Sequence, residues 1–315
     1  MALRLALMIE GQEGLTWDRW RRLARTAEDG GFDALFRSDH LTGLFGDARR
    51  PSLETWASLT WLATATSRIR FGPLVSPLTF HHPALLAKRA AAVAELSGGR
   101  LDLGIGAGWH EGEHRMFGIP FPPLKERVDR LECGARAIRA LWQGKKVTVP
   151  QPYYALVEAE SHPTPPGGRV PLIIGARGER RTLAIAAAHA DEWNITRVTF
   201  DDYATKRGVL ESRCAAAGRD PGTIARSLMV PIIVGRTGAE LAARHARARA
   251  IFPRVPEDEA SWRAAGFLYG TPERVVIDLK QWESLGVQRV MLQMLDMEDD
   301  AAMDLLAREV VPACR

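Results

Sequence analysis

Short apolar segments alternate with longer helical segments from one end of this chain to the other, and this alternation constrains the fold most strongly. Strands are predicted at residues 3–9, 32–37, 69–75, 101–105, 170–174, 192–195, 224–234 and 289–295. Helices are predicted after them at residues 16–30, 52–66, 83–96, 125–141, 179–189, 203–217, 271–284 and 299–311, with a more variable helical region at 238–265. Apolar strands separated by long helices form a parallel sheet covered by helices. Eight such units therefore predict an α/β protein with a (β/α)8 TIM barrel.

The chain shows no break that would divide it into two domains. Its 315 residues would by length alone suggest about two domains, although α/β barrels of this size commonly form one. An irregular, proline-rich segment at about 143–169 follows the fourth strand–helix unit. We expect this segment to be an insertion that contains a hairpin. We therefore predict one domain over residues 1–315.

Charge and cysteine content argue against several kinds of partner. The formal net charge is +4, and Lys and Arg are scattered among the helices, which argues against nucleic acid but suits an anionic ligand. The three cysteines, Cys133, Cys214 and Cys314, are too far apart for a C-x-x-C site and favour a reducing compartment. The apolar N-terminal stretch is too short for a signal peptide, and no run reaches membrane-spanning length. We expect a cytoplasmic protein that does not bind membranes.

The active site of such a barrel lies where the strands end, at the C-terminal face. The residues predicted there are Glu10, Ser38, Asp39, His40, Leu74, Val75, Ser76, Gly106, Ala107, Gly108, Trp109, His110, Gly175, Ala176, Arg177, Gly178, Asn194, Thr196 and Gln293. Two glycine-rich turns, 106–108 and 175–178, can present backbone N–H groups to an anionic or carbonyl-bearing ligand. Arg177 adds a cation that suits phosphate. Ser38 and His40 do not suggest a nucleophile with its base, because adjacent side chains at a strand end diverge.

The segment at 100–114 contains two motifs that would indicate other functions. A dinucleotide fingerprint needs G-x-G-x-x-G, but glycines at 104, 106 and 108 place the third one residue early. His110-Glu111-x-x-His114 matches a zinc-protease motif, which needs a sustained helix. Gly112 weakens that helix by about 1 kcal/mol, and prolines from Pro120 onward end it. We expect a short solvated helix whose His and Glu side chains serve packing and hydrogen bonding, and no metal site, with zinc hydrolysis as a less favoured alternative.

Motifs spread over most of the chain carry a family resemblance. They are GFDAL (31–35) before SDH (38–40), IxFGxLVS (69–76), HPALLAK (82–88), SGGRLxLGxGAGW (97–109), ER (126–127), PLIIG (171–175), AxADEWN (188–194), GTPE (270–273) and GV (286–287). In their order and spacing they resemble the bacterial luciferase-like superfamily, and in particular its deazaflavin-dependent branch, which uses coenzyme F420.

The resemblance implies a TIM barrel with an insertion and assigns roles to the strand ends. The cofactor ring would rest against a bulge at Leu74, Val75 and Ser76, often with a non-prolyl cis peptide, and Asp39 and His40 would flank it. The remaining cofactor-binding residues, for the ribityl chain, the phosphate and the ring, would be Ala107, Gly108, Trp109, Gly175, Ala176, Arg177 and Gly178. His40 is the candidate catalytic proton donor or acceptor, because the unperturbed pKa of histidine lies near neutrality.

Trp109 departs from one part of this family. The sugar-phosphate dehydrogenases that the chain resembles have a carboxylic acid at this position, directly after the strand-four glycines. Trp109 cannot accept a proton, so we do not expect that activity, and we expect Trp109 to shape an apolar substrate pocket. Glu13, Glu111 and Glu113 could replace the acid, but the sequence selects none of them.

The resemblance therefore implies an oxidoreductase that transfers a hydride between coenzyme F420 and a small organic substrate. The closest alternative is an FMN-dependent monooxygenase, and a non-catalytic flavin-binding barrel is a further one. Luciferase-like barrels often form homodimers through helices, and the helix that carries Trp56 and Trp61 could contribute to such a contact.

Overall fold

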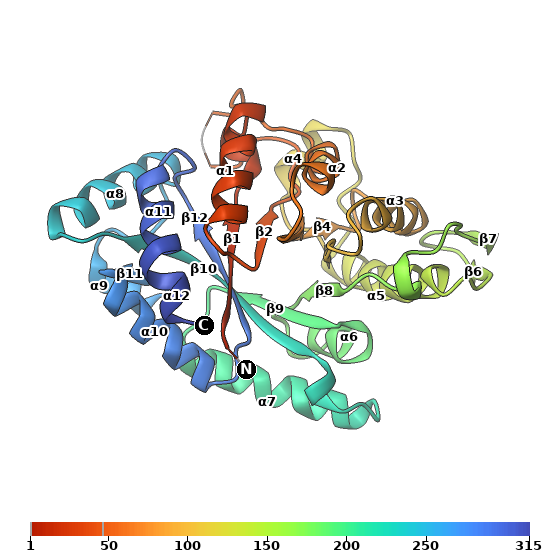
Figure 1. Cartoon of the computed structure of the whole chain (residues 1–315). Helices are drawn as coiled ribbons and strands as arrows, with labels where there is room; N and C mark the ends of the chain where they lie inside the picture. The colour runs from red at the N-terminus through yellow and green to blue at the C-terminus, as the bar shows by residue number, and fades with distance from the viewer. Residues whose placement is uncertain (1, 46) are drawn as a thin grey trace.

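A computed structural model describes residues 2–45 and 47–315 and contains a closed barrel of parallel strands (Figure 1). The strands are β1 (Arg4–Ile9), β2 (Ala34–Arg37), β3 (Arg70–Pro73), β4 (Ser76–Pro77), β5 (Leu103–Gly106), β8 (Leu172–Gly175), β9 (Glu192–Thr196), β10 (Ala225–Val234) and β12 (Arg289–Met294). Their order is β3-β2-β1-β12-β10-β9-β8-β5-β4. β3 and β4 are the two halves of the third predicted strand, and a parallel bridge between Phe71 and Leu101 closes the ring. The predicted (β/α)8 TIM barrel is confirmed.

Helices surround this barrel in Figure 1. They are α1 (Trp17–Asp29), α2 (Thr55–Ala65), α3 (Pro83–Leu96), α5 (Leu124–Trp142), α6 (Thr182–His189), α7 (Phe200–Ala216), α10 (Pro272–Ser284) and α11 (Asp300–Leu305), which continues into η4 (Leu306–Val310) and α12 (Val311–Ala313). Side chains of Thr16, Thr199 and Thr271 cap three of them by accepting a backbone N–H three residues later. No helix among the described residues is long and apolar enough to cross a membrane.

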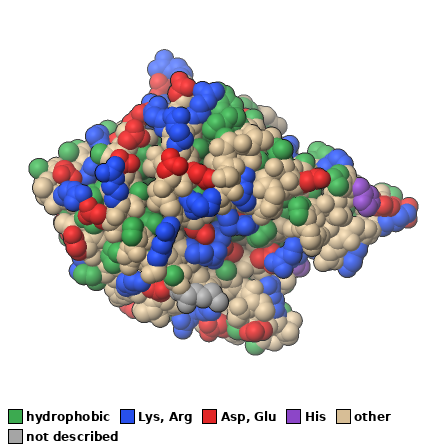
Figure 2. All heavy atoms as spheres, viewed as in Figure 1, with side chains coloured by type: hydrophobic (Ala, Val, Ile, Leu, Met, Phe, Trp, Pro, Cys, Tyr) green, Lys and Arg blue, Asp and Glu red, His purple; other side chains and the backbone are tan. Residues whose placement is uncertain are grey.

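Two regions add elements to the eight units. The expected hairpin in the insertion is confirmed as β6 (Val147–Val149) paired antiparallel with β7 (Leu156–Ala159), and it projects beside α5 at the right of Figures 1 and 2. The variable helical region forms α8 (Gly238–Ile251) and α9 (Glu259–Ala264). A short strand that the sequence did not predict, β11 (Leu268–Gly270), then pairs with the end of β10.

A buried ionic cluster fills the N-terminal end of the barrel. Nη1 of Arg289 lies 2.8 Å from Oδ2 of Asp102, and Nε lies 3.2 Å from Oδ2 of Asp33. Glu192 lies 3.5 Å from the same guanidinium, and Arg70 pairs with Asp102 from the other side. Each residue stands at or just before the first position of its strand, so the cluster closes the barrel at the end opposite to the predicted active site. Charges of both signs are also interspersed over the surface that Figure 2 shows.

Candidate functional site

The interruption of the third strand brings the predicted cofactor segments together. The peptide bond between Leu74 and Val75 is cis, as the family resemblance implies. A Cβ atom on Gly106 would lie 2.7 Å from Cγ2 of Val75, and one on Gly104 would lie 3.0 Å from Cγ1. A Cβ atom on Gly175 would lie 3.6 Å from Cγ1 of the same side chain. Glycine at 104 and 106 therefore makes room for the bulge, and both glycine turns lie against it.

The second glycine turn is partly occupied by its own hydrogen bonds. The N–H of Ala176 donates to the carbonyl of Asn194 at 3.1 Å, and that of Gly178 donates to Oγ1 of Thr182 at 2.9 Å. These bonds reduce the number of N–H groups that the sequence predicted for a ligand. Arg177 is exposed and contacts Asp202 only at 3.4 Å, so its guanidinium is the charged group that this turn presents.

His40 forms a buried ion pair with Glu113. Nδ1 of His40 lies 2.7 Å from Oε1 of Glu113, and the other carboxylate oxygen accepts the N–H of Leu41 at 3.0 Å. The side chains of His40 and Glu113 are 14% and 1% exposed. Burial alone would lower the pKa of His40, but the hydrogen bond and charge of Glu113, with the charges of Glu10 and Asp39, raise it above the usual value. The pair therefore favours a proton on His40.

The HExxH motif builds the turn that places Glu113. In α4 (Glu111–Met116), Nδ1 of His110 accepts the N–H of Glu113 at 3.2 Å and so caps the helix. Nδ1 of His114 lies 2.7 Å from the carbonyl oxygen of His110. The ring of His114 packs between Phe80 and Phe121, with centroids 4.5 and 4.7 Å away. The helix is short and one side of it is solvated, as expected, with Glu111, Arg115 and Met116 exposed, but Glu113 and His114 on its other side are buried.

Metal binding finds no support in this geometry. The two histidines of the motif are used in capping and packing rather than aimed at one point. In the described part of the chain, no group of three or more His, Cys, Asp or Glu side chains could hold a metal ion.

Asp39 is the centre of a second buried cluster. Its Oδ2 atom accepts a hydrogen bond from the hydroxyl of Ser76 and lies 2.8 Å from Nε2 of His81. Burial would raise the pKa of Asp39, but the hydrogen bond and charge of His81, the Ser76 hydroxyl and the charge of Arg37 lower it to about 2. The Asp39 carboxyl is therefore an anion at neutral pH.

Two side-chain amides donate hydrogen bonds to the carboxylate of Glu10, which directly follows β1. Nε2 of Gln12 donates to Glu10 at 2.9 Å, and Nε2 of Gln293 donates to its other oxygen. The hydroxyl of Ser38 donates to Gln12 and accepts the N–H of Gly11 at 3.1 Å. Ser38 is therefore bound away from His40, in agreement with the expectation that the two do not form a nucleophile and base.

Only one of the three acids considered as replacements at position 109 reaches His40. Glu13 accepts the N–H of Leu44 at 2.7 Å and pairs with Arg50 at 2.9 Å, and Glu111 is exposed. Glu113 is the acid in contact with His40, and the sequence named it without selecting it. The sequence could not predict its contact with His40, because that contact depends on where α4 lies relative to the end of β2.

Trp109 forms an aromatic wall beside His40. Its ring stands edge-on to His40 with centroids 5.9 Å apart and to His110 with centroids 5.1 Å apart. The residue is 59% exposed. Met116, Phe117 and Leu124 in the same part of the chain are also large, apolar and more than half exposed. The exposed ring of Trp109 therefore provides an apolar face beside His40.

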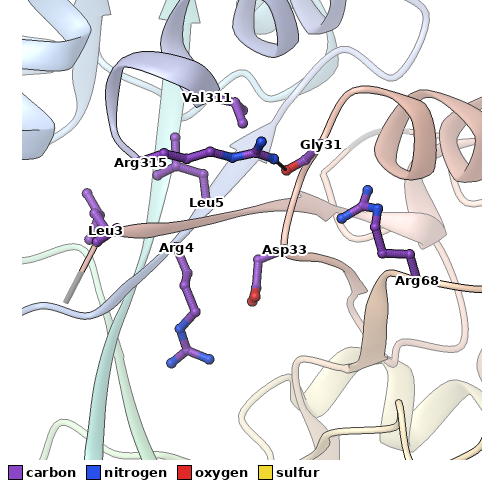
Figure 3. A pocket seen from close by; sticks show the side chains of 9 residues that line it. Leu3, Arg4, Leu5, Gly31, Asp33, Arg68, Val311 and Arg315 are labelled. Atoms are coloured by element: carbon purple, nitrogen blue, oxygen red, sulfur yellow. Dashed lines mark hydrogen bonds between the residues drawn. The ribbon is translucent and has the colours of Figure 1, made fainter.

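A pocket of about 210 Å³ lies at the other end of the barrel (Figure 3). Its lining residues include Arg4, which begins β1, Asp33 and Arg68, which precede β2 and β3, and Arg315 at the end of the chain. Arg315 donates to the carbonyl of Gly31 at 2.6 Å, as Figure 3 shows. This pocket contains none of the residues at the C-terminal strand ends, so it is separate from the candidate site.

Sequence comparisons connect the chain with known proteins. The luciferase-like monooxygenase family matches residues 4–289. The chain is 31% identical over 229 residues to the F420-dependent hydroxymycolic acid dehydrogenase of Mycobacterium tuberculosis. The aligned segment covers 72% of this chain and 62% of that protein. It is 36% identical over 160 residues to the F420-dependent glucose-6-phosphate dehydrogenase of Beutenbergia cavernae. This alignment covers 50% of this chain and 46% of that protein. The matched part spans less than two thirds of either relative.

The fold is also similar to that of solved structures. One is an F420-dependent secondary alcohol dehydrogenase in complex with an F420–acetone adduct, which aligns over 100% of both chains with a TM-score of 0.85 and 20% identity. At this level of identity the likeness supports the fold and not the substrate.

Proposed function

Because the chain belongs to the luciferase-like monooxygenase family, we propose that it is an oxidoreductase that transfers a hydride between coenzyme F420 and a small organic substrate. The observation that carries this proposal is the buried His40–Glu113 pair, which adjoins Asp39, the residue that contacts Ser76 in the bulge. The F420-dependent dehydrogenases among the relatives support the choice of cofactor. The FMN-dependent monooxygenase remains the alternative.

The residues at the strand ends suit a flavin-like group. Leu74, Val75 and Ser76 form a bulge that faces both glycine turns, and Asp39 supplies an anion beside it. We assign the ring to these residues together with Ala107, Gly108 and Trp109. We assign the phosphate to the turn Gly175, Ala176, Arg177 and Gly178, where Arg177 is the available cation.

His40 is the catalytic residue of this proposal. When bound, a deazaflavin supplies a carbon that accepts or donates a hydride. Oxidation of an alcohol to a carbonyl releases a proton from oxygen in addition to the hydride, and the reverse reaction consumes one. Because Glu113 engages Nδ1 of His40, Nε2 is the atom that takes or returns this proton. Glu113 is a positioning residue that orients the ring and raises the pKa of His40.

The substrate of this proposal is an apolar alcohol or the corresponding carbonyl compound. Trp109 stands beside His40 and carries no charge that could share in proton transfer. We therefore do not propose dehydrogenation of a sugar phosphate, although one relative bears that name.

A binding titration tests the cofactor. We expect the purified protein to quench or enhance F420 fluorescence in a saturable manner and to bind FMN more weakly. Tight binding of FMN alone would overturn the F420 assignment and favour the monooxygenase.

A variant tests the role of His40. His40→Gln should keep F420 binding and lose turnover on a panel of apolar alcohols, whereas an unchanged rate would contradict the role of His40.

We further propose that the chain is one cytoplasmic domain that forms a homodimer. Trp61 is half-buried and lies 6.2 Å from the ring of Trp17, which is 38% exposed, so these two residues can belong to a dimer surface. Trp56, on the same helix, is only 3% exposed and packs inside the chain, so it is not part of that surface. Light scattering on the purified protein tests this proposal, and a monomer at all concentrations would contradict it.

A further inference from the structure

Three side chains from separate elements meet at one carboxylate oxygen. Asp39 follows β2, Ser76 begins β4, and His81 precedes α3. The Ser76 hydroxyl and the Nε2 atom of His81 both contact Oδ2 of Asp39, the second at 2.8 Å. Asp39 is 4% exposed, Ser76 is fully buried, and the His81 side chain is 15% exposed. His81 therefore lies on the outer side of a buried carboxylate that borders the cofactor bulge.

The position of a hydrogen on His81 follows from its contact with Asp39. An ionised carboxyl can only accept, so the Nε2 atom of His81, 2.8 Å away, carries a hydrogen and donates it to Oδ2. On the other side of the ring, Nη1 of Arg89 lies 3.5 Å from Nδ1 of His81. Arg89 is itself held over the ring of Trp56, 5.5 Å from its centroid. Arg89 of α3 therefore lies against the outer nitrogen of His81.

The two hydrogen bonds to Oδ2 leave the other oxygen of Asp39 for a ligand. Over residues 2–45 and 47–315, the hydrogen-bond partners of the Asp39 carboxylate, Ser76 and His81, both contact Oδ2, and no donor to Oδ1 is found. The charged or titratable groups that act on Asp39 are Arg37 on β2, the neighbouring His40, and His81, which Arg89 contacts from α3. A buried carboxylate without such partners would take up a proton.

We propose that His81 is a positioning residue that fixes the carboxyl group of Asp39 through Oδ2, so that Oδ1 accepts a hydrogen bond from a ring N–H of the bound deazaflavin. This inference rests on the proposed function. An ionised carboxylate accepts hydrogen bonds and donates none, so it selects an N–H edge of the ring over a carbonyl edge. His81 contributes to cofactor binding in this way without touching the cofactor.

The first test needs no cofactor. Carboxyl ¹³C NMR of the full-length protein should show Asp39 still ionised at pH 4 in the wild type. His81→Phe removes the donor, so the pKa of Asp39 should rise, whereas His81→Gln retains an N–H donor and should show a smaller rise. His82→Phe is the matched control, because His82 is the next residue but lies against Tyr154, with 5.5 Å between ring centroids. An unchanged pKa of Asp39 in His81→Phe would overturn the proposal.

The second test measures F420 affinity by fluorescence titration. His81→Phe should weaken binding at least about tenfold, the size expected for a hydrogen bond to a charged group. His81→Gln and His82→Phe should bind nearly as well as the wild type. In an Asp39→Asn background, His81→Phe should have no further effect, whereas the same loss in both backgrounds would mean a general structural effect and would overturn the proposal.

The two tests separate this inference from the proposed function. A wild type that does not bind F420, with the pKa of Asp39 still raised in His81→Phe, would refute the cofactor but support the effect of His81 on Asp39. A wild type that binds F420 with equal affinity in His81→Phe would refute the role of His81 and leave the cofactor in place.

Discussion

The two ends of the barrel both bury carboxylates, but they pair them with different partners. At the N-terminal end, Asp102 contacts the guanidinium of Arg289 at 2.8 Å. At the C-terminal end, Glu113 contacts the imidazole of His40 at 2.7 Å. An arginine keeps its charge at any pH near neutrality, whereas a histidine gains and loses a proton there. The first end is therefore suited to closing the barrel and the second to moving protons.

At the N-terminal end, Asp102 and Arg289 stabilise each other's charged forms, whereas the surroundings of Glu192 oppose its ionisation. Burial opposes ionisation of Asp102, but Arg289 and Arg70 hold its pKa below the usual value. Burial likewise opposes the charge on Arg289, but Glu192, Asp102 and Asp33 raise its pKa further. The pKa of Glu192 is raised, because burial and the charge of Asp102 outweigh the attraction of Arg289. Breaking this cluster should affect stability and leave the chemistry of the other end intact.

The largest expected effect is on stability. Asp102→Asn removes one partner of a buried ion pair, which should lower the free energy of unfolding by about 3–5 kcal/mol. Urea denaturation measures this loss, and F420 affinity should not change. Asp18→Asn is the control, because its pair with Arg21 is exposed and such pairs contribute at most about 1 kcal/mol. An equally small loss in Asp102→Asn would mean that the buried cluster does not hold the barrel together.

Glu113→Gln should have the largest effect on activity. It removes the charge that raises the pKa of His40, so we expect turnover to fall about 100-fold, the lower range for general acid–base catalysis. The limb of the kcat/KM profile that reports His40 should move to lower pH. Glu111→Gln changes an exposed acid two residues away and serves as the control. A profile that keeps its position in Glu113→Gln would refute the coupling of the two residues.

Trp109→Ala should change substrate binding with little change in stability. Trp109 is 59% exposed, so the free energy of unfolding should stay within about 0.5 kcal/mol of the wild type. Loss of the wall beside His40 should raise KM for an apolar alcohol about tenfold, or 1.4 kcal/mol. Val157→Ala, 80% exposed on the hairpin strand β7, is the control. Equal values of KM in the two variants would show that Trp109 is only part of the surface.

The sequence predicted the parts of the fold that repeat. Apolar strands and long helices give strong periodic patterns, so eight units and the barrel could be recognised. β11 has three residues, too few for a pattern, and was missed. The strand-end rule placed Asp39, His40 and the bulge at one face of the barrel, because parallel strands end together. That rule needs only the order of the strands and no knowledge of loop conformation.

The partners of these residues could not be predicted in the same way. His40 and Glu113 are 73 positions apart, and Asp39 and His81 are 42 apart. Both contacts depend on how short loops and α4 fold over the barrel, which leaves no periodic signal. The HExxH segment matches the residue spacing of a metal-site motif. Its histidines instead cap and pack the helix that carries Glu113.

The smallest expected effect is the pH dependence of stability that His40 contributes. Its pKa is higher in the folded protein than in the unfolded chain, where it is about 6.5. The folded state therefore binds the proton more tightly, and this stabilisation is complete below the unfolded pKa and lost as pH rises through the folded pKa. The free energy of unfolding of the wild type relative to His40→Gln should be highest near pH 6 and should decline toward pH 9 in urea denaturation. The same comparison with His82→Gln controls for an exposed histidine. A difference that grows with pH for His40 would mean that burial outweighs Glu113 and that the pair does not hold a proton.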